Sequence, residues 1–149
     1  MKDDGALFPW CQQSRRSTTH KRVYSQNCRD VMYRYYNANP KGLLTDDCVL
    51  RSISVAEGIT WAQCQEKLSQ LSKKDAMLLN DIRFVEKYLD ERYPRKCYTN
   101  LTIGDFAKQC PKGNYVVTTN GHITAIINNV IVDTWDCSKR IMKCCWQIK

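Results

Sequence analysis

The hydrophobic pattern of this chain is helical in its middle part and strand-like toward its C-terminus. Apolar residues recur at helical spacing after Cys48, and further helical patterns begin near Thr60 and Asp81. From Tyr115 onward, short apolar runs separated by turn residues predict strands instead. Helices followed by strands are typical of the α+β class, so we expect N-terminal helices packed on a C-terminal antiparallel sheet.

Capping residues mark the ends of the predicted helices. Asp46 or Asp47 can cap the first helix, and Gly58 suits the left-handed conformation in which a helix often ends. Thr60 and Gln63 have the spacing of a capping box, which opens the second helix. Helical spacing predicts three more helices, at Asn27–Tyr36, from Asp81 to before Pro94, and from Thr102 to about Lys108.

The last part of the chain predicts an antiparallel meander. The expected strands are Tyr115–Thr118, His122–Ile127, Val130–Trp135 and a tail strand within Ile141–Ile148. Two asparagines at 128 and 129 suit a two-residue hairpin turn, because Asn tolerates positive φ better than most residues. The turn therefore sets the register of the two strands that it joins.

The length of 149 residues fits one domain with a continuous core. Hydrophobic and charged fractions of 43% and 26% are those of an ordinary soluble globular protein. We expect a basic N-terminal arm over residues 1–25 and a single domain over residues 26–149.

Apolar runs such as Ile123–Val132 are shorter than the roughly 20 residues of a membrane span. With no signal-peptide pattern at the N-terminus, we expect a cytoplasmic protein without a membrane partner.

The net charge of +8 is unevenly distributed, since residues 1–40 contain seven Lys and Arg against three Asp. A basic front end can contact nucleic acid or an acidic partner. The alternative, which the composition favours, is a solvated and partly disordered arm. The charge therefore leaves nucleic acid open as a partner without requiring it.

Nine cysteines are many for a chain of this length. In a cytosolic protein they are expected to be reduced, and most of them to be small buried apolar residues. A zinc site usually contains close Cys or His pairs, and no C-x-x-C motif occurs here. The loose set that could converge on a metal is Cys97, Cys110, Cys137, Cys144 and Cys145. We expect no metal and no other cofactor.

Cys48 is the cysteine best placed to act as a nucleophile. Cysteine reacts as a thiolate, and a helix N-terminus stabilises a thiolate through its free N–H groups and its positive dipole end. Of the two histidines, His20 lies in the predicted arm, so His122 is the candidate base. A buried structural cysteine and a core histidine are the alternative interpretation of these two residues.

The hairpin register selects Asp133 as the third member of the site. If Asn128 and Asn129 form the turn, His122 and Asp133 lie on one face of the sheet as diagonal neighbours. Asp133 can then orient the imidazole and stabilise its charged form, whereas Asp136 falls on the opposite face. A shift of the register by one residue would reverse this choice.

Several short segments resemble an uncharacterised family of papain-like cysteine hydrolases that is common in Firmicutes and their phages. The similarity covers about Tyr35 to Trp146. It rests on Asn39-Pro40-Lys41, Asp47-Cys48-Val49-Leu50-Arg51-Ser52-Ile53, Thr60-Trp61, Asn80-Asp81, Pro111-Lys112-Gly113-Asn114-Tyr115, Gly121-His122 and Val132-Asp133-Thr134-Trp135-Asp136-Cys137. Asp46 departs from the Asn or Gly often found two residues before the nucleophile, and the N-terminal arm is additional to the family pattern.

The resemblance implies a papain-like fold and a Cys48, His122 and Asp133 triad that works through a thioester intermediate. The resemblance also suggests a phage origin, and with it the host cytosol as location, but it implies no substrate. From the triad chemistry we expect a peptidase, amidase or deamidase with a protein or peptide substrate. Papain-like enzymes also place an Asn or Gln upstream as an oxyanion donor. Asn39 is the residue we assign to that position, with Asn37 and a purely turn-forming role as alternatives.

Trp135 is expected to line a substrate groove or, alternatively, to be part of the core. The rival function is a catalytically inactive papain-like module that binds a host protein or nucleic acid through a basic surface. The sequence predicts neither the substrate nor the oligomeric state.

Overall fold

The computed structural model describes residues 32–149. The expected arm at residues 1–25, His20 and the first residues of the helix predicted at Asn27–Tyr36 lie outside the described residues.

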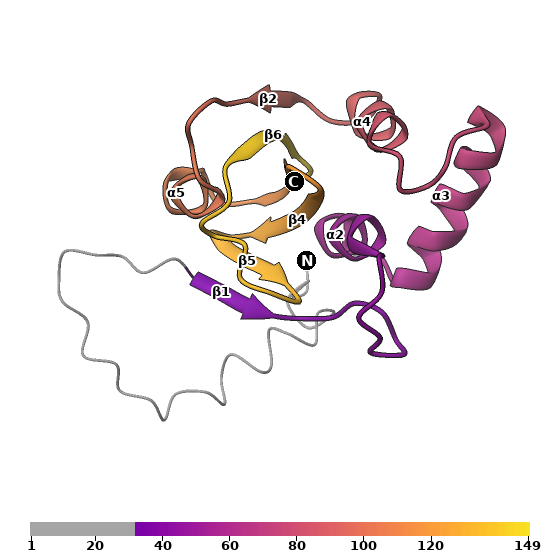
Figure 1. Cartoon of the computed structure of the whole chain (residues 1–149), viewed down its shortest axis with the longest axis horizontal. Helices are drawn as coiled ribbons and strands as arrows, with labels where there is room; N and C mark the ends of the chain where they lie inside the picture. Colours follow the sequence, from indigo (N-terminus) through magenta and orange to yellow (C-terminus); the bar gives the residue numbers. More distant parts are fainter. Residues whose placement is uncertain (1–31) are drawn as a thin grey trace, which may run out of the picture. The chain divides into compact units, whose positions relative to one another are not determined.

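The described chain is an α+β structure of four helices and six strands (Figure 1). In chain order the elements are β1 (Met32–Tyr35), α2 (Cys48–Glu57), α3 (Trp61–Asp75), α4 (Ile82–Asp90), β2 (Arg95–Cys97), α5 (Ile103–Gln109), β3 (Asn114–Thr119), β4 (His122–Ile127), β5 (Val130–Asp133) and β6 (Met142–Gln147). The α+β class is therefore confirmed.

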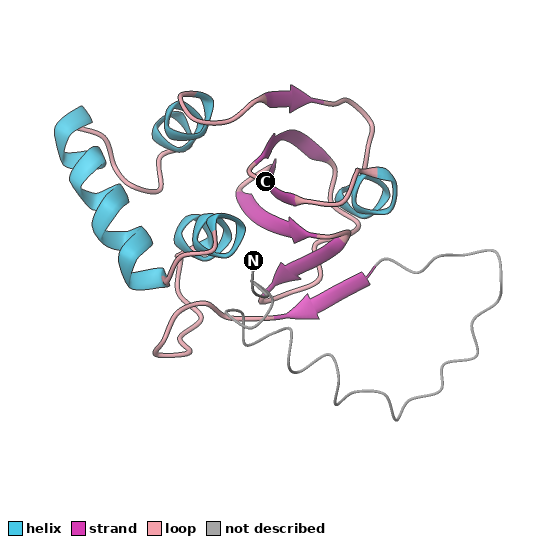
Figure 2. Ribbon diagram, turned by 180° about the vertical axis from the view of Figure 1, so that it is seen from behind, coloured by secondary structure: helices cyan, strands magenta, loops and turns pink. Residues whose placement is uncertain are grey.

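The helices cover both sides of one sheet. Helix α2 packs on β4, β3 and β5, and α3 packs on α2. Helices α2, α3 and α4 lie to one side of the sheet and α5 to the other, which Figure 2 shows from behind. The helix that begins with Cys48 thus lies directly against the strands that begin with His122 and end with Asp133.

The sheet is mixed, not wholly antiparallel as expected. Its strand order is β1-β5-β4-β3-β6-β2, and β1 runs parallel to β5 while the other pairs are antiparallel. The helix predicted over Asn27–Tyr36 is wrong at Met32–Tyr35, which forms β1. This short aromatic-rich segment suits a strand as well as a helix. In the structure this segment pairs in parallel with β5, almost a hundred residues away in sequence, and this pairing favours the strand over the helix.

A second difference lies between α4 and α5, where β2 forms an edge strand that the hydrophobic pattern did not predict. It pairs with β6, and Cys97 lies directly opposite Cys144. The two form a disulfide, with Cα atoms 4.0 Å apart. The expectation that the cysteines are all unpaired is therefore wrong for this pair. The cause is the β2–β6 pairing, which brings together thiols that are 47 residues apart in sequence.

The β4–β5 hairpin has the predicted register near its turn. Asn128 and Asn129 have φ of 47° and 68°, the positive values that a type I′ turn requires. Ile127 pairs with Val130, and the ladder continues to Ala125 opposite Val132. The paired register of the two strands ends there, and β5 itself ends at Asp133.

The helix ends follow their capping residues. Gly58 ends α2 at a φ of 75°, and Thr60 and Gln63 form the predicted capping box at the start of α3. Helix α4 buries Val85 and Leu89. None of the helices in residues 32–149 combines the length and the apolar composition needed to cross a membrane.

Helix α5 covers the face of the sheet that α2 leaves free. Ile103 and Phe106 pack on Tyr115 of β3 and on Ile126 and Ile131 of the β4–β5 hairpin. The ring of Phe106 meets that of Tyr115 edge to face, with centroids 5.5 Å apart. The strands that carry His122 and Asp133 are therefore packed between helices on both faces of the sheet.

Candidate active site

Cys48 is the first residue of helix α2. The N–H groups of a first helical turn have no partner within the helix and carry the positive end of its dipole. The Cys48 side chain is half-buried, whereas the other unpaired cysteines of residues 32–149 are buried: Cys64, Cys110, Cys137 and Cys145. Cys48 therefore combines access to solvent with a place at the positive end of a helix dipole.

His122 is placed by the tight turn between β3 and β4. It pairs with Thr119 across this hairpin, so only Asn120 and Gly121 form the turn. Gly121 has a φ of 71°, which an L side chain rarely adopts, and a glycine meets this requirement without strain. The turn thus fixes His122 as the first residue of β4.

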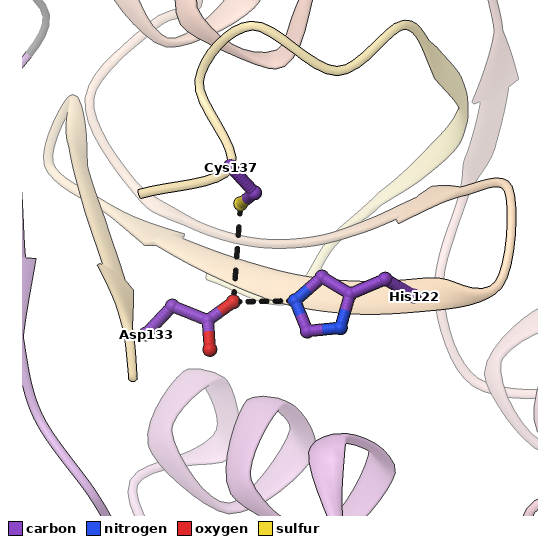
Figure 3. A group of neighbouring side chains, drawn as sticks. All are labelled: His122, Asp133 and Cys137. Carbon is purple, nitrogen blue, oxygen red and sulfur yellow. Dashed lines mark hydrogen bonds and ion pairs between the residues drawn. The ribbon is translucent and has the colours of Figure 1, made fainter. Parts of the chain in front are cut away.

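The imidazole of His122 is held by Asp133, as the sequence predicted. Its Nε2 lies 2.7 Å from Oδ2 of Asp133, at the end of β5 (Figure 3). Only 5% of Asp133 is exposed to solvent. The second ring nitrogen, Nδ1, points away from Asp133. Since Nε2 is committed to the carboxylate, Nδ1 is the nitrogen left to exchange a proton with a thiol.

The Asp133 carboxylate makes four further contacts, one of which is a 3.5 Å hydrogen bond that Oδ1 accepts from the Thr134 hydroxyl. Its Oδ1 accepts a hydrogen bond of 2.7 Å from the backbone N–H of Thr134 and lies 3.9 Å from Nη2 of Arg51. Its Oδ2 accepts a hydrogen bond of 3.8 Å from the Cys137 thiol, as well as facing His122 (Figure 3). Both carboxylate oxygens are occupied, so the orientation of Asp133 is fixed from two sides.

These contacts set the charge of His122. Burial alone lowers the pKa of His122, because it disfavours the charged form. Hydrogen bonds to Asp133, Cys137 and Cys48, together with the negative charge of Asp133, act in the opposite direction. They raise the pKa of His122 from 6.5 to about 11. The imidazole is therefore positively charged at neutral pH, and an imidazolium beside Cys48 stabilises a thiolate.

Cys48 and His122 open onto one pocket of about 470 Å³. Its apolar wall comes from Val49 and Ile123 beside the two candidate catalytic residues and from Ile82 and Val85 of α4. Its polar rim is formed by Asp46, Asn80, Glu86, Asn120 and Lys143, among others. The nucleophile and the base thus share a concave surface large enough for a bound side chain.

Trp135 lies against His122 but outside this pocket. Its ring centroid is 4.9 Å from that of His122, and 40% of the residue is exposed. It therefore covers one side of the imidazole and presents an aromatic surface to solvent. Trp135 is therefore not a core residue, and its role at a substrate groove stays a prediction.

Asn39 is brought near the nucleophile, but its amide is engaged within its own loop. Its Nδ2 donates to Oδ2 of Asp47 at 3.1 Å, and its Oδ1 accepts from the backbone N–H of Lys41. Asn37 also stabilises this loop by donating to the carbonyl of Leu43. These contacts describe a loop-forming role for both asparagines, and the oxyanion role of Asn39 stays a prediction.

Among residues 32–149, His122, Asp133 and Cys137 also form a group that could hold a metal ion, with ligand atoms within 4.8 Å of one another. The 2.7 Å between Nε2 and Oδ2 is the length of a hydrogen bond. Two ligands of a tetrahedral zinc ion are instead about 3.3 Å apart. Of the cysteines considered for zinc from the sequence, Cys97 and Cys144 form a disulfide. The geometry is that of hydrogen-bonded side chains.

Comparisons of the chain with models of known protein families, with curated proteins and with solved structures find no match. The interpretation of this site therefore rests on the chain's own residues and on their arrangement.

Two residues of the site were not predicted to belong to it. The Asp47 carboxylate was expected only as a helix cap, yet it makes no capping hydrogen bond. It accepts instead from the side chains of Asn39, Arg51 and Trp61. Arg51, which is 8% exposed, links Asp47 to Asp133. The sequence contained one signal for this pair. Arg51 is a charged residue among apolar and small residues of the helix, and it follows Asp47 by four residues.

Proposed function

We propose that this chain is a papain-like cysteine hydrolase in which Cys48 is the nucleophile, His122 the base and Asp133 the residue that orients the base. The observation that carries the proposal is the arrangement of the imidazole. Its Nε2 lies 2.7 Å from a buried carboxylate, and Cys48, at the start of α2, lines the same pocket as the ring and helps to raise the pKa of His122. This is the general pattern of an activated nucleophile, its base and a third orienting group.

The proposed reaction has two steps. The Cys48 sulfur attacks the carbonyl carbon of an amide, and as the C–N bond breaks His122 donates its proton to the leaving amine. Water then attacks the resulting thioester while His122 accepts a proton from it. The amine leaves in the first step and the carboxylic acid in the second, which restores the Cys48 thiolate beside the protonated imidazole. Asp133 keeps its charge throughout and stabilises the imidazolium whenever it forms.

The oxyanion of each tetrahedral intermediate needs hydrogen-bond donors. The backbone N–H of Cys48, at the start of α2, is the first donor that we assign. The side-chain amide of Asn39 is the second donor that the family resemblance implies. It would have to turn away from Asp47, to which its Nδ2 donates.

A polypeptide is the substrate class that we propose. The pocket beside Cys48 combines an apolar wall with a polar rim, which suits an amino-acid side chain. On the other side of the imidazole, Trp135 offers an exposed aromatic surface to the neighbouring part of the chain. Peptidase, amidase and deamidase activities are all compatible with this arrangement.

Limited alkylation with iodoacetamide near pH 6, mapped by mass spectrometry, tests the proposal. At this pH an ordinary thiol is only about 0.3% ionised, because its pKa is near 8.5. A thiolate held by His122 is expected to react first, so Cys48 should be modified before any other cysteine. Slow labelling without preference for Cys48 would contradict the enzyme and favour the alternative, a binding module with an inactive triad.

A further inference from the structure

Two buried carboxylates lie within reach of a single guanidinium in the site. Asp47 and Asp133 are 8% and 5% exposed, and Arg51, also 8% exposed, lies between them. Nη1 of Arg51 is paired with Oδ1 of Asp47, and Nη2 lies 3.9 Å from Oδ1 of Asp133. Burying a carboxylate is costly unless it is paired and hydrogen-bonded. Arg51 is the arginine that both of these carboxylates share.

The position of Asp47 makes this pairing matter for the nucleophile. Asp47 is the residue immediately before Cys48 and the N-cap residue of α2. Without a counter-ion, its negative charge would oppose a second negative charge on the neighbouring sulfur. Hydrogen bonds from Asn39 and Trp61 hold the carboxylate in place but carry no positive charge. Neutralisation of Asp47 therefore depends on Arg51.

Arg51 also acts on the other side of the site. One oxygen of Asp133 faces His122, and the other is held by the Thr134 N–H and by the approach of Arg51. The same guanidinium donates to the backbone carbonyl of Thr45, which ties it to the loop before the nucleophile. The loop, the helix start and the triad carboxylate are thus joined through one side chain.

We propose that Arg51 is a positioning residue of this site: it neutralises Asp47 beside Cys48 and fixes Asp133 behind His122. The inference rests on the proposed function, because it assigns Arg51 a role in keeping Cys48 reactive. Arg51 lies in the second turn of α2 and is buried, and it acts through the two aspartates. We therefore expect Arg51 to change the pH at which Cys48 becomes reactive.

The test is the pH profile of Cys48 alkylation in the full chain. Arg51→Met removes the positive charge and keeps most of the side-chain volume. We expect the pH at which the labelling rate is half-maximal to rise by about one unit, which is about tenfold in thiolate fraction below that pH. Arg51→Lys retains the charge and is expected to stay closer to the unmodified protein. An Arg51→Met profile equal to that of the unmodified protein would overturn the inference.

A double variant separates charge from loss of structure. Asp47→Asn with Arg51→Met removes both members of the buried pair, a change that proteins often tolerate. If Arg51 acts by neutralising Asp47, the double variant should label at lower pH than Arg51→Met alone. An equal shift in both would contradict that role. The other charged groups at the pocket, Asp46, Glu86 and Lys143, are unchanged in each variant.

A surface arginine provides the matched control. Arg83 is paired with Asp81 at the start of α4, and its side chain is 78% exposed. Arg83→Met removes the same charge from the chain and is expected to leave the profile unchanged. If the unmodified protein itself shows no preferred labelling of Cys48, the proposed function fails. If the unmodified protein labels Cys48 preferentially and Arg51→Met gives the same pH profile, the role of Arg51 fails and the proposed function stands.

Discussion

Replacement of His122 by alanine is expected to slow turnover of an activated acyl ester by about 10²- to 10⁴-fold, the usual contribution of a general base. The imidazole is held by Asp133 at 2.7 Å and shares a pocket with Cys48, so its removal takes away both the proton acceptor and the positive charge on the side of the nucleophile. Release of p-nitrophenolate from p-nitrophenyl acetate, with the ester in excess, measures the turnover.

The other histidine of the chain supplies the control for this variant. His20→Ala removes a histidine outside the described residues and is expected to retain the turnover of the unmodified protein. Folding of both variants is compared by circular dichroism. A His122→Ala protein that is folded and hydrolyses the ester as fast as the His20→Ala protein would show that His122 is not the base.

Replacement of Asp133 by asparagine is expected to lower the pKa of His122 by several units from about 11. In the unmodified protein, the hydrogen bond and the charge of Asp133 outweigh burial, which by itself lowers this pKa. Asparagine keeps a similar shape but has no negative charge. Nuclear magnetic resonance of the labelled imidazole ring as a function of pH measures the change directly. Titration of His122 near pH 6.5 in the unmodified protein would contradict the account.

The same shift predicts how stability depends on pH. A histidine whose pKa is higher in the folded than in the unfolded chain contributes stability that is fully present below the unfolded value, near 6.5. This contribution is lost as the pH rises toward the folded value of about 11. Between pH 7 and 10 the free energy of unfolding is therefore expected to fall more steeply in the unmodified protein than in Asp133→Asn. The difference should be on the order of a few kcal/mol, measured by denaturant unfolding.

Local sequence signals were sufficient for much of the site. The start of α2 at Cys48 follows from aspartates before an apolar helical pattern, and the structure confirms it. The turn at Asn128 and Asn129 fixes the strand register, and that register brings His122 to Asp133. Both are short-range features, in which a few neighbouring residues determine the backbone geometry.

Features that depend on distant parts of the chain were not predictable in this way. Strand β1 was predicted as a helix because its own residues allow either conformation, and pairing with β5 decided the outcome. The Cys97–Cys144 disulfide required the unpredicted strand β2. Arg51 reaches Asp133 only because α2 packs on the β4–β5 hairpin, a contact that no local pattern specifies.

The central claim is that Cys48 forms a covalent thioester intermediate, and trapping this intermediate tests it most directly. The full chain is incubated briefly with p-nitrophenyl acetate, quenched in acid and mapped by mass spectrometry. We expect one acetyl group on Cys48, removable by hydroxylamine, and none at this position in Cys48→Ala. Cys64→Ala, which removes a buried cysteine, should retain the adduct. Absence of acetylation at Cys48, or equal acetylation of several cysteines, would contradict the account.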